Sequence, residues 1–370
     1  MKKVLLIMAA AVSLLTGCGQ KGYVQLTGYA QGGTWSVKYN TEGLKARPAE
    51  VLKGIEAILS DIDTSLSGYN KASLLSRLNT GDTIRPNGML AGMYRRCRKY
   101  WQETEGALDV AAGPVFDIWG FGFKNDSLPS HTLVLEALAS SGMDRLLPRL
   151  EDALLPDGRL YAGDLVERAV ACTADFSGNP VDGLPQLNFN AVAQGFSADT
   201  VAGYLRALGA KDMLVDIGEI FCSGVNQYGK PWKIGVDRPT DGNNTPGADL
   251  DGIWESSGLP EGQGIVTSGN YRKFYIKDGR KYSHTIDPRT GYPVASEPSD
   301  TTLLSATIAA PCSEEADAYA TACMVIGLAK ARDFIGARSG LEGYLIYSLP
   351  DGSMEEWASG GFNLIEKSKD

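Results

Sequence analysis

One segment of the chain gathers polar and charged side chains around two short alternating runs. Residues 267–293 read TSGNYRKFYIKDGRKYSHTIDPRTGYP, in which residues 271–276 and 281–286 can pair as an antiparallel hairpin. The segment carries hydroxyls, amides beside glycines, several cations and His284, one of two histidines in the chain. Such a set suits an anionic ligand that bears phosphate. A polar surface hairpin with an ordinary strand histidine explains the same composition equally well.

A second group of polar side chains lies in the helical pattern of residues 312–328. Asp317 and Thr321 are four residues apart and share one helix face, with Glu314 one turn earlier on that side. A carboxylate and a hydroxyl at this spacing can bind one hard cation together with carbonyl and phosphate oxygens. An acidic first turn that interacts favourably with the helix dipole is the alternative explanation.

The rest of the pattern predicts the elements that must position these groups. Apolar residues at helical spacing or in alternation predict helices at 48–66, 71–78, 87–104, 131–140, 142–147 and 192–208, and strands at 23–30, 34–39, 166–175, 213–218, 220–224, 232–237, 303–309, 343–348 and 354–358. Residues 239–264 are rich in Gly, Pro, Asn and Asp and have no period, so a loop insertion is expected there.

Six motifs in order along residues 23–365 resemble those of the FAD:protein FMN transferases, the ApbE-like family. They are LSGY at 66–69, GALDVAAGP with WGFG at 106–122, LNFNAVAQGFSAD at 187–199, VDIGEI at 215–220, TSGNYR with HTIDPRTGYP at 267–293, and ADAYAT at 316–321. Four positions depart from the family pattern: Ala111 replaces a threonine, Asn188 an aspartate, Gln194 a lysine and Glu219 a glycine. Gln194 can still donate a hydrogen bond, but without the charge of lysine.

The resemblance implies a fold and a set of site residues. The fold is α+β, with antiparallel sheets flanked by helices and two lobes that hold the flavin nucleotide in the crevice between them. Mg²⁺ is expected on Asp317, Thr321 and the carbonyl of Ala191. Contacts to FAD are expected from Tyr69, Ala107, Leu108, Asp109, Asn188, Gln194 and Ile286. The adenine is expected near Tyr69 and residues 107–109.

The activity implied by the resemblance is transfer of FMN from FAD to a Ser or Thr hydroxyl of a partner protein. His284 is expected to take the proton of that hydroxyl, while AMP leaves and FMN stays bound through a phosphoester. The resemblance further implies that the acceptor is a membrane redox subunit. Two alternatives remain open at this level: a Mg²⁺-dependent FAD pyrophosphatase that forms FMN and AMP, and a non-catalytic FAD-binding lipoprotein.

Composition and the N-terminus predict where the protein works. The 370 residues carry a net charge of −9, which argues against a nucleic-acid partner because no basic excess is available for a phosphate backbone. Residues 1–17 resemble a signal peptide that ends at LTGC, so Cys18 is expected to carry the lipid and 18–22 to be a linker. We therefore expect an extracytoplasmic, lipid-anchored protein, at the periplasmic face of the inner membrane in a Gram-negative cell. Residues 366–370 are expected to be a frayed tail.

Five further cysteines are scattered without metal-binding spacing. Their positions favour buried free thiols, although one disulfide remains open.

Overall fold

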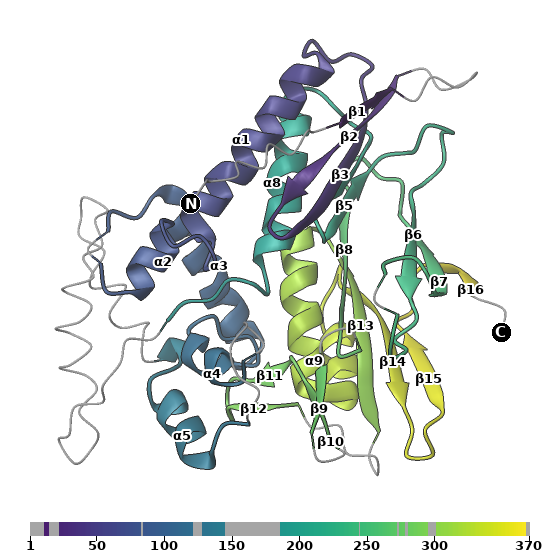
Figure 1. Ribbon diagram of the computed structural model, residues 1–370. Coiled ribbons are helices and arrows are strands. Elements are labelled where there is room, and N and C mark those ends of the chain that lie inside the picture. Colours follow the sequence, from purple (N-terminus) through teal and green to yellow (C-terminus); the bar gives the residue numbers. More distant parts are fainter. Residues whose placement is uncertain are drawn as a thin grey trace.

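A broad antiparallel sheet forms the centre of the protein in this computed structural model (Figure 1). The structure describes residues 11–14, 22–82, 84–120, 128–144, 186–243, 245–271, 274–277, 280–294 and 301–367. Within them the sheet has nine strands, whose order across the sheet is β1 (Ala11–Leu14), β2 (Tyr23–Ala30), β3 (Gly33–Asn40), β4 (Met213–Asp216), β5 (Ile220–Ser223), β8 (Gln263–Gly269), β13 (Thr302–Ala310), β14 (Glu342–Ser348) and β15 (Met354–Ala358).

Three long helices cover one face of this sheet: α1 (Pro48–Leu66), α8 (Ala193–Ala207) and α9 (Ser313–Gly336) (Figure 1). The other face packs against a three-stranded sheet with the order β16 (Leu364–Lys367), β7 (Leu250–Glu255) and β6 (Lys233–Asp237). Strand alternation produces both interfaces, since Ile308 of β13 packs toward α9 and its neighbour Ala309 toward the small sheet. The central strands of the main sheet, β13 among them, are therefore covered on both sides.

Smaller elements lie beside the helical layer. They are α2 (Leu74–Asn79), α3 (Gly88–Glu103), α4 (Gly113–Ile118), α5 (His131–Ala139), and two hairpins, β9 (Phe274–Lys277) with β10 (Arg280–Ser283) and β11 (Ile286–Asp287) with β12 (Tyr292–Pro293). α4 and α5 form a separate small core with Ile286.

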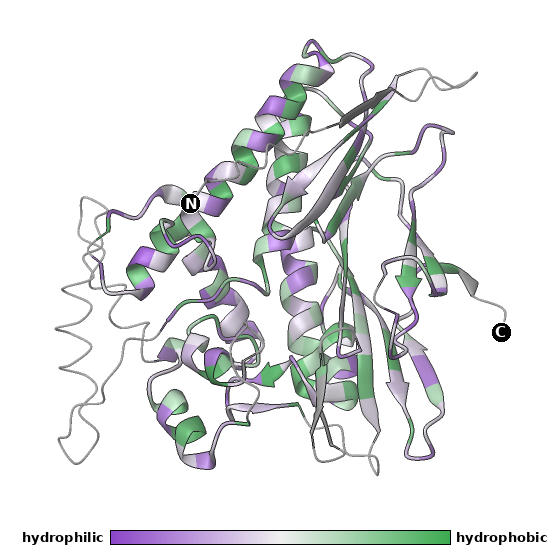
Figure 2. Ribbon diagram, in the orientation of Figure 1, coloured by the Kyte–Doolittle hydropathy of each residue, from purple (hydrophilic) through white to green (hydrophobic). Residues whose placement is uncertain are grey.

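Helix α9 is the element on which this packing converges. It contacts β8, β13, α8 and β14, and its buried residues are mostly alanines and other small side chains. Figure 2 shows hydrophobic and hydrophilic residues along this helix. A helix with apolar residues on most of its surface is stable only where other elements surround it, and small side chains let those elements approach closely. Asp317, a polar residue within this packed surface, therefore lies inside the protein.

Most predicted elements are confirmed. α1 begins and ends at the predicted residues, and α3 begins after Asn87, whose side chain accepts a hydrogen bond from the Leu90 amide. The expected α+β class with antiparallel sheets and flanking helices is confirmed.

Other expectations need correction or are not tested. The loop expected at 239–264 is wrong, because it contains β7, in which Gly252 and Trp254 are buried, and the start of β8. The expected tail is ordered as far as Lys367 through pairing with β7. The strand predicted at 166–175, part of the helix at 142–147 and Cys18 lie outside the described residues.

The N-terminal expectations remain predictions. β1 lies within the expected signal peptide and pairs with β2, so cleavage before Cys18 would remove one edge strand of the sheet. None of the described helices combines the length and apolar character that a bilayer crossing requires. Four cysteines, Cys97, Cys222, Cys312 and Cys323, are free thiols.

Candidate functional site

Helices α8 and α9 cross in direct contact at Gly195. A side chain at this position would collide with the carbonyl oxygen of Ser313 and with the Cβ of Asp317. Only glycine therefore lets the first turn of α8 lie against the first turns of α9. This close approach brings together two motifs that are far apart in the sequence.

Each of the two helices is capped by a carboxylate of the other. The Gly195 amide, in the first turn of α8, donates to Asp317 Oδ2 of α9 at 3.1 Å. In return, the Ser313 and Glu314 amides, which open α9, donate to the two carboxylate oxygens of Asp199 on α8, each at 2.8 Å. Amides in a first helical turn have no partner within their own helix, so each carboxylate supplies one that the helix lacks. We refer to this arrangement as the reciprocal cap.

Burial changes the acidity of both capping residues. The side chain of Asp317 is only 5% exposed, and desolvation raises its pKa to about 7, with the nearby Glu314 and Asp199 carboxylates acting in the same direction. Burial likewise raises the pKa of Asp199 to about 6, although the amides of Glu314 and Ser313 oppose the shift. A bound cation at this crossing would favour the charged form of Asp317.

Glu314 lies near Asp317 but has a different role from the one its spacing suggested. Its Oε1 accepts hydrogen bonds from Arg96 at 2.8 Å and from the Tyr100 hydroxyl at 3.1 Å, both on α3. This ion pair, in which Glu314 is buried and Arg96 is partly exposed, fixes α3 against the start of α9. Glu314 is therefore bound to α3 rather than directed into a cation site with Asp317.

The oxygen donors near Asp317 fit a hard cation in part. Thr321, one turn further along α9, has its hydroxyl 3.4 Å from that of Ser268 on β8, and Ala191 lies in the turn before α8. No group of three His, Cys, Asp or Glu side chains that could hold a metal occurs among the described residues. One carboxylate with hydroxyl and carbonyl oxygens is a set suited to Mg²⁺, which keeps waters and takes further oxygens from a phosphorylated substrate.

Gln194 and Asn188 lie at the entry to α8. The side-chain amide of Gln194 packs against Gly218. A Cβ added at Gly218 would lie 2.6 Å from Gln194 Nε2. Gly218 has a φ of +95°, in the region that favours glycine, and its amide donates to Asp216. Asn188 accepts a hydrogen bond from the Asn190 amide at 2.9 Å, which shapes the turn before the helix. Both expected FAD contacts thus lie next to the reciprocal cap.

Tyr69 is brought to the same region from the other side. It follows the C-terminus of α1 and is 64% exposed, and its hydroxyl accepts a hydrogen bond from Asn190 Nδ2 at 3.1 Å. A solvent-facing ring beside the turn that precedes α8 can stack on a planar group. The structure therefore places Tyr69 beside Asn190, two residues after Asn188, and its contact with FAD stays a prediction.

The loop of Ala107, Leu108 and Asp109 offers fewer groups to a nucleobase than expected. The amides of Ala107 and Leu108 both bond to Thr104, so only the carbonyl oxygens of these two residues remain for a ligand. The Asp109 carboxylate accepts hydrogen bonds from the amides of Ala111 and Met143, and burial raises its pKa. Asp109 therefore holds its own loop in place, as a structural aspartate does.

His284 and Ile286 follow β10 along the chain. His284 is half-buried in the bend between β10 and β11. Ile286 is buried in the small core formed with α4 and α5, so it can reach a ligand only through its backbone. Arg289, which contributed to the expected positive site, forms two 2.8 Å hydrogen bonds with Asp287 and lies against Gly106. It is therefore paired within its own turn rather than open to a phosphate.

Asn270 is a residue that the sequence reasoning did not single out. It is 4% exposed, its Oδ1 accepts a hydrogen bond from Thr285 at 2.6 Å, and its Nδ2 has no partner among the described residues. A buried donor without a partner is rare in native proteins and requires an acceptor. Asn270 lies two residues after Ser268, and its hydrogen-bond partner Thr285 follows His284 in the chain. A phosphate oxygen of a nucleotide bound there would supply the missing acceptor.

Comparisons with known proteins define the class to which this fold and site belong. Residues 31–345 match the model of the ApbE family, and the chain belongs to that family.

Named relatives and solved structures agree over nearly the full length. The chain is 31% identical to the FAD:protein FMN transferase of Haemophilus influenzae, over 98% of both chains. It is 30% identical to the protein of the same name from Escherichia coli K12, over 96% of this chain and 95% of the relative. The structure superposes on the flavin transferase ApbE of Vibrio cholerae with a TM-score of 0.70 at 26% identity, covering 92% of this chain and 98% of the other. The apo flavinyl transferase ApbE of Pseudomonas stutzeri gives the same TM-score and identity over 96% of both chains.

Proposed function

We propose that this protein transfers FMN from FAD to an acceptor protein. Family membership and near full-length similarity to proteins named FAD:protein FMN transferase support this activity. The observation that carries it is the buried Asp317 carboxylate at the α8–α9 crossing, close to Thr321, Gln194 and the turn that leads to Tyr69. A buried acidic group among oxygen donors, together with the buried Asn270 amide, which has no partner among the described residues, suits a metal-bound diphosphate.

The chemistry we assign to this site requires Mg²⁺. Asp317, Thr321 and the Ala191 carbonyl would hold the ion, with the remaining positions filled by water and by pyrophosphate oxygens of FAD. When bound, Mg²⁺ withdraws charge from the diphosphate and so makes AMP a better leaving group. Gln194 and Asn188 would donate hydrogen bonds to the dinucleotide, and the Tyr69 ring would lie against a planar ring of FAD.

His284 is proposed as the general base. It accepts the proton of a Ser or Thr hydroxyl on the acceptor, whose oxygen attacks the FMN-side phosphorus. The bond from that phosphorus to the bridging oxygen breaks, AMP leaves with the bridging oxygen, and FMN remains joined to the acceptor by a phosphoester. A neutral imidazole is needed for this step, because only an unprotonated ring nitrogen can accept the proton.

The test replaces each of the two histidines. His284→Ala should lower the rate of FMN transfer by about 10²–10⁴-fold, because general-base catalysis contributes about that much. His131→Ala is the matched control, since His131 lies on α5, where its ring stacks on Tyr292. Flavin fluorescence that stays with the acceptor after denaturing electrophoresis measures transfer, with EDTA as the metal-free arm. Near wild-type transfer by His284→Ala would show that another group is the base.

The same assay separates the two alternative functions. An FAD pyrophosphatase would form FMN and AMP with Mg²⁺ and leave the acceptor unmodified. A non-catalytic FAD-binding lipoprotein would leave FAD intact, and the replacement of the family lysine by Gln194 is the feature that favours it.

We also propose that the protein is anchored outside the cytoplasm through a lipid on Cys18. The support is the sequence of residues 1–18, a basic start, a short apolar run and LTGC. The acceptor would then be a membrane redox subunit at the same surface. Cys18→Ala should move the protein from the membrane fraction to the soluble fraction.

A further inference from the structure

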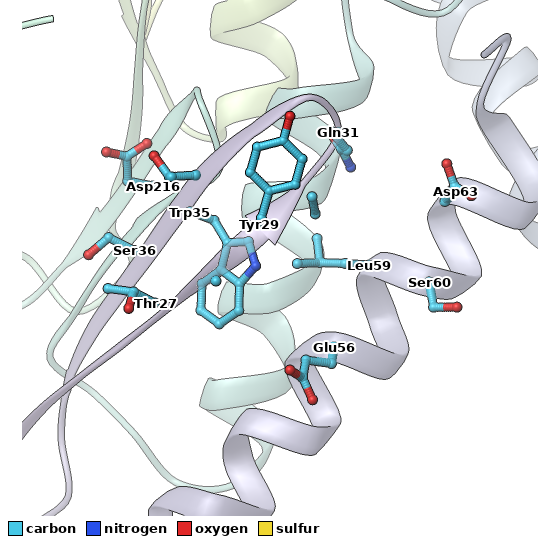
Figure 3. Close-up of a pocket in the computed structure, with 13 residues that line it drawn as sticks. Thr27, Tyr29, Gln31, Trp35, Ser36, Glu56, Leu59, Ser60, Asp63 and Asp216 are labelled. Atoms are coloured by element: carbon cyan, nitrogen blue, oxygen red, sulfur yellow. The ribbon is translucent and has the colours of Figure 1, made fainter. Parts of the chain in front are cut away.

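A groove of about 870 Å³ opens between the β2–β3 hairpin and α1 (Figure 3). Trp35 forms its floor, with the indole flat against Gly28, where any side chain would overlap the ring. Tyr29, about half exposed, stands at its rim. We call this the α1 groove, lined by residues 27–31 and 34–36 together with Glu56, Leu59, Ser60, Asp63 and Asp216.

Two lining residues connect the α1 groove to helix α8 and the expected nucleotide site. Gln31 donates to the Ser197 hydroxyl of α8 at 2.5 Å. Asp216 accepts a 3.0 Å hydrogen bond from the amide of Gly218, the glycine that packs against Gln194. The inner wall of the groove is therefore continuous with the start of α8, where the reciprocal cap lies.

A third lining residue leads to the aromatic side of the site. Asp63 accepts a hydrogen bond from Asn70 Nδ2 at 2.6 Å, and the neighbouring residue Tyr69 bonds to Asn190 before α8. A segment lying in the groove would thus end beside Tyr69 and the entry to α8. An acceptor must reach this point to present a hydroxyl to the phosphorus of FAD.

The charge of the groove indicates what it binds. Glu56, Asp63 and Asp216 line it, and none of its described lining residues is Lys or Arg. These carboxylates repel the diphosphate of FAD and attract a cation. Trp35, Tyr29 and Leu59 supply aromatic and aliphatic surface, against which the methylene groups of a Lys or Arg side chain can pack.

We propose that the α1 groove binds an extended, basic segment of the acceptor protein next to the hydroxyl that receives FMN. This inference rests on the proposed transfer to a protein. It assigns recognition of the acceptor to α1 and the β2–β3 hairpin, and chemistry to the α8–α9 crossing.

The test reverses one charge inside the groove and one outside it. Glu56 and Asp61 are both exposed residues of α1, but only Glu56 lines the groove. With a purified acceptor domain that the wild-type protein flavinylates, Glu56→Lys should lower kcat/KM for the acceptor about tenfold and leave KM for FAD within about twofold, whereas Asp61→Lys should change neither. Added salt should weaken wild-type transfer more than transfer by Glu56→Lys. An acceptor with Lys or Arg near its modified hydroxyl changed to Glu should recover activity with Glu56→Lys.

Several results would overturn the inference. Equal acceptor kinetics for Glu56→Lys and Asp61→Lys would remove the groove from acceptor recognition. A raised KM for FAD in Glu56→Lys would assign the groove to the nucleotide instead. If the wild-type protein forms FMN and AMP but modifies no acceptor, the proposed function fails together with the inference.

Discussion

The α8–α9 crossing and the α1 groove use the same residue types in opposite ways. At the crossing, Asp199 and Asp317 each accept hydrogen bonds from backbone amides of the other helix. In the groove, Glu56, Asp63 and Asp216 line an open space with no cationic residue among the described lining, and the bonds that Asp63 and Asp216 accept come from nearby residues of their own segments, Asn70 and Gly218. Carboxylates that are bonded in this way determine where helices lie, whereas carboxylates around an open cavity influence what can enter it. The difference separates positioning from recognition within one molecule.

The largest effect should come from the charge at the crossing. Asp317→Asn keeps an oxygen that can accept the Gly195 amide, so the reciprocal cap and the fold should persist. It removes the negative charge, and we expect FMN transfer to fall by about 10²-fold or more, because the proposed metal loses its one carboxylate ligand. Mn²⁺ binding, followed by electron paramagnetic resonance, should weaken in parallel.

Asp333→Asn, an exposed position on the same helix, is the control and should bind Mn²⁺ as the wild type does. Unchanged Mn²⁺ binding by Asp317→Asn would contradict the assigned metal site and leave Asp317 with a capping role only.

An intermediate effect concerns stability and should appear as a pH dependence. The pKa of Asp199 is raised from 3.8 to about 6 by burial, so between about pH 4 and pH 6 the folded protein binds more protons than the unfolded chain. The contribution of Asp199 to the free energy of unfolding should therefore fall as the pH rises through this window, by about 2–3 kcal/mol. Urea denaturation at a series of pH values, without metal, measures it.

In the Asp199→Asn variant the side chain at position 199 cannot ionise, so the free energy of unfolding should not show this decline with pH. The altered cap changes the free energy of unfolding at every pH. Parallel pH curves for the two proteins would show that the Asp199 carboxylate is not the group responsible.

The smallest effect should come from the exposed edge of the site. Tyr69→Phe removes only the hydroxyl that accepts a hydrogen bond from Asn190. We expect the free energy of unfolding to fall by less than about 1 kcal/mol and the affinity for FAD to fall by less than about threefold. Tyr69→Ala should weaken FAD binding further if the ring stacks on the ligand. Quenching of flavin fluorescence on titration measures both. Equal affinities for the two variants would mean that the ring takes no part.

The local sequence pattern predicted most helices and strands. It could not predict contacts between segments that are far apart in the chain. The apolar spacing of α1 and the spacing of Asp317 and Thr321 were readable because each depends on one helix. Glu314 shares a helix face with Asp317, but its bonds to Arg96 and Tyr100 depend on where α3 lies, which helical spacing does not contain.

Three further features could not be predicted from the sequence for related reasons. The Gly- and Asn-rich flanks of β7 hid a strand whose stability comes from pairing with β6 and β16. Asn270 is notable only because its amide is buried without a partner among the described residues, and burial is a property of the assembled fold. Asp199 was visible as a motif position, while its capping role required the start of α9, 115 residues away in the chain.

The reciprocal cap has a consequence for how the protein is made. During synthesis, α8 leaves the ribosome long before residue 317 exists, so its first turn cannot be completed until most of the chain has been translated. Incomplete products that stop before α9 would lack both the partner of α8 and the residues proposed to hold the metal. Catalytic competence would then arrive only with the nearly finished polypeptide, and shortened copies would not consume FAD.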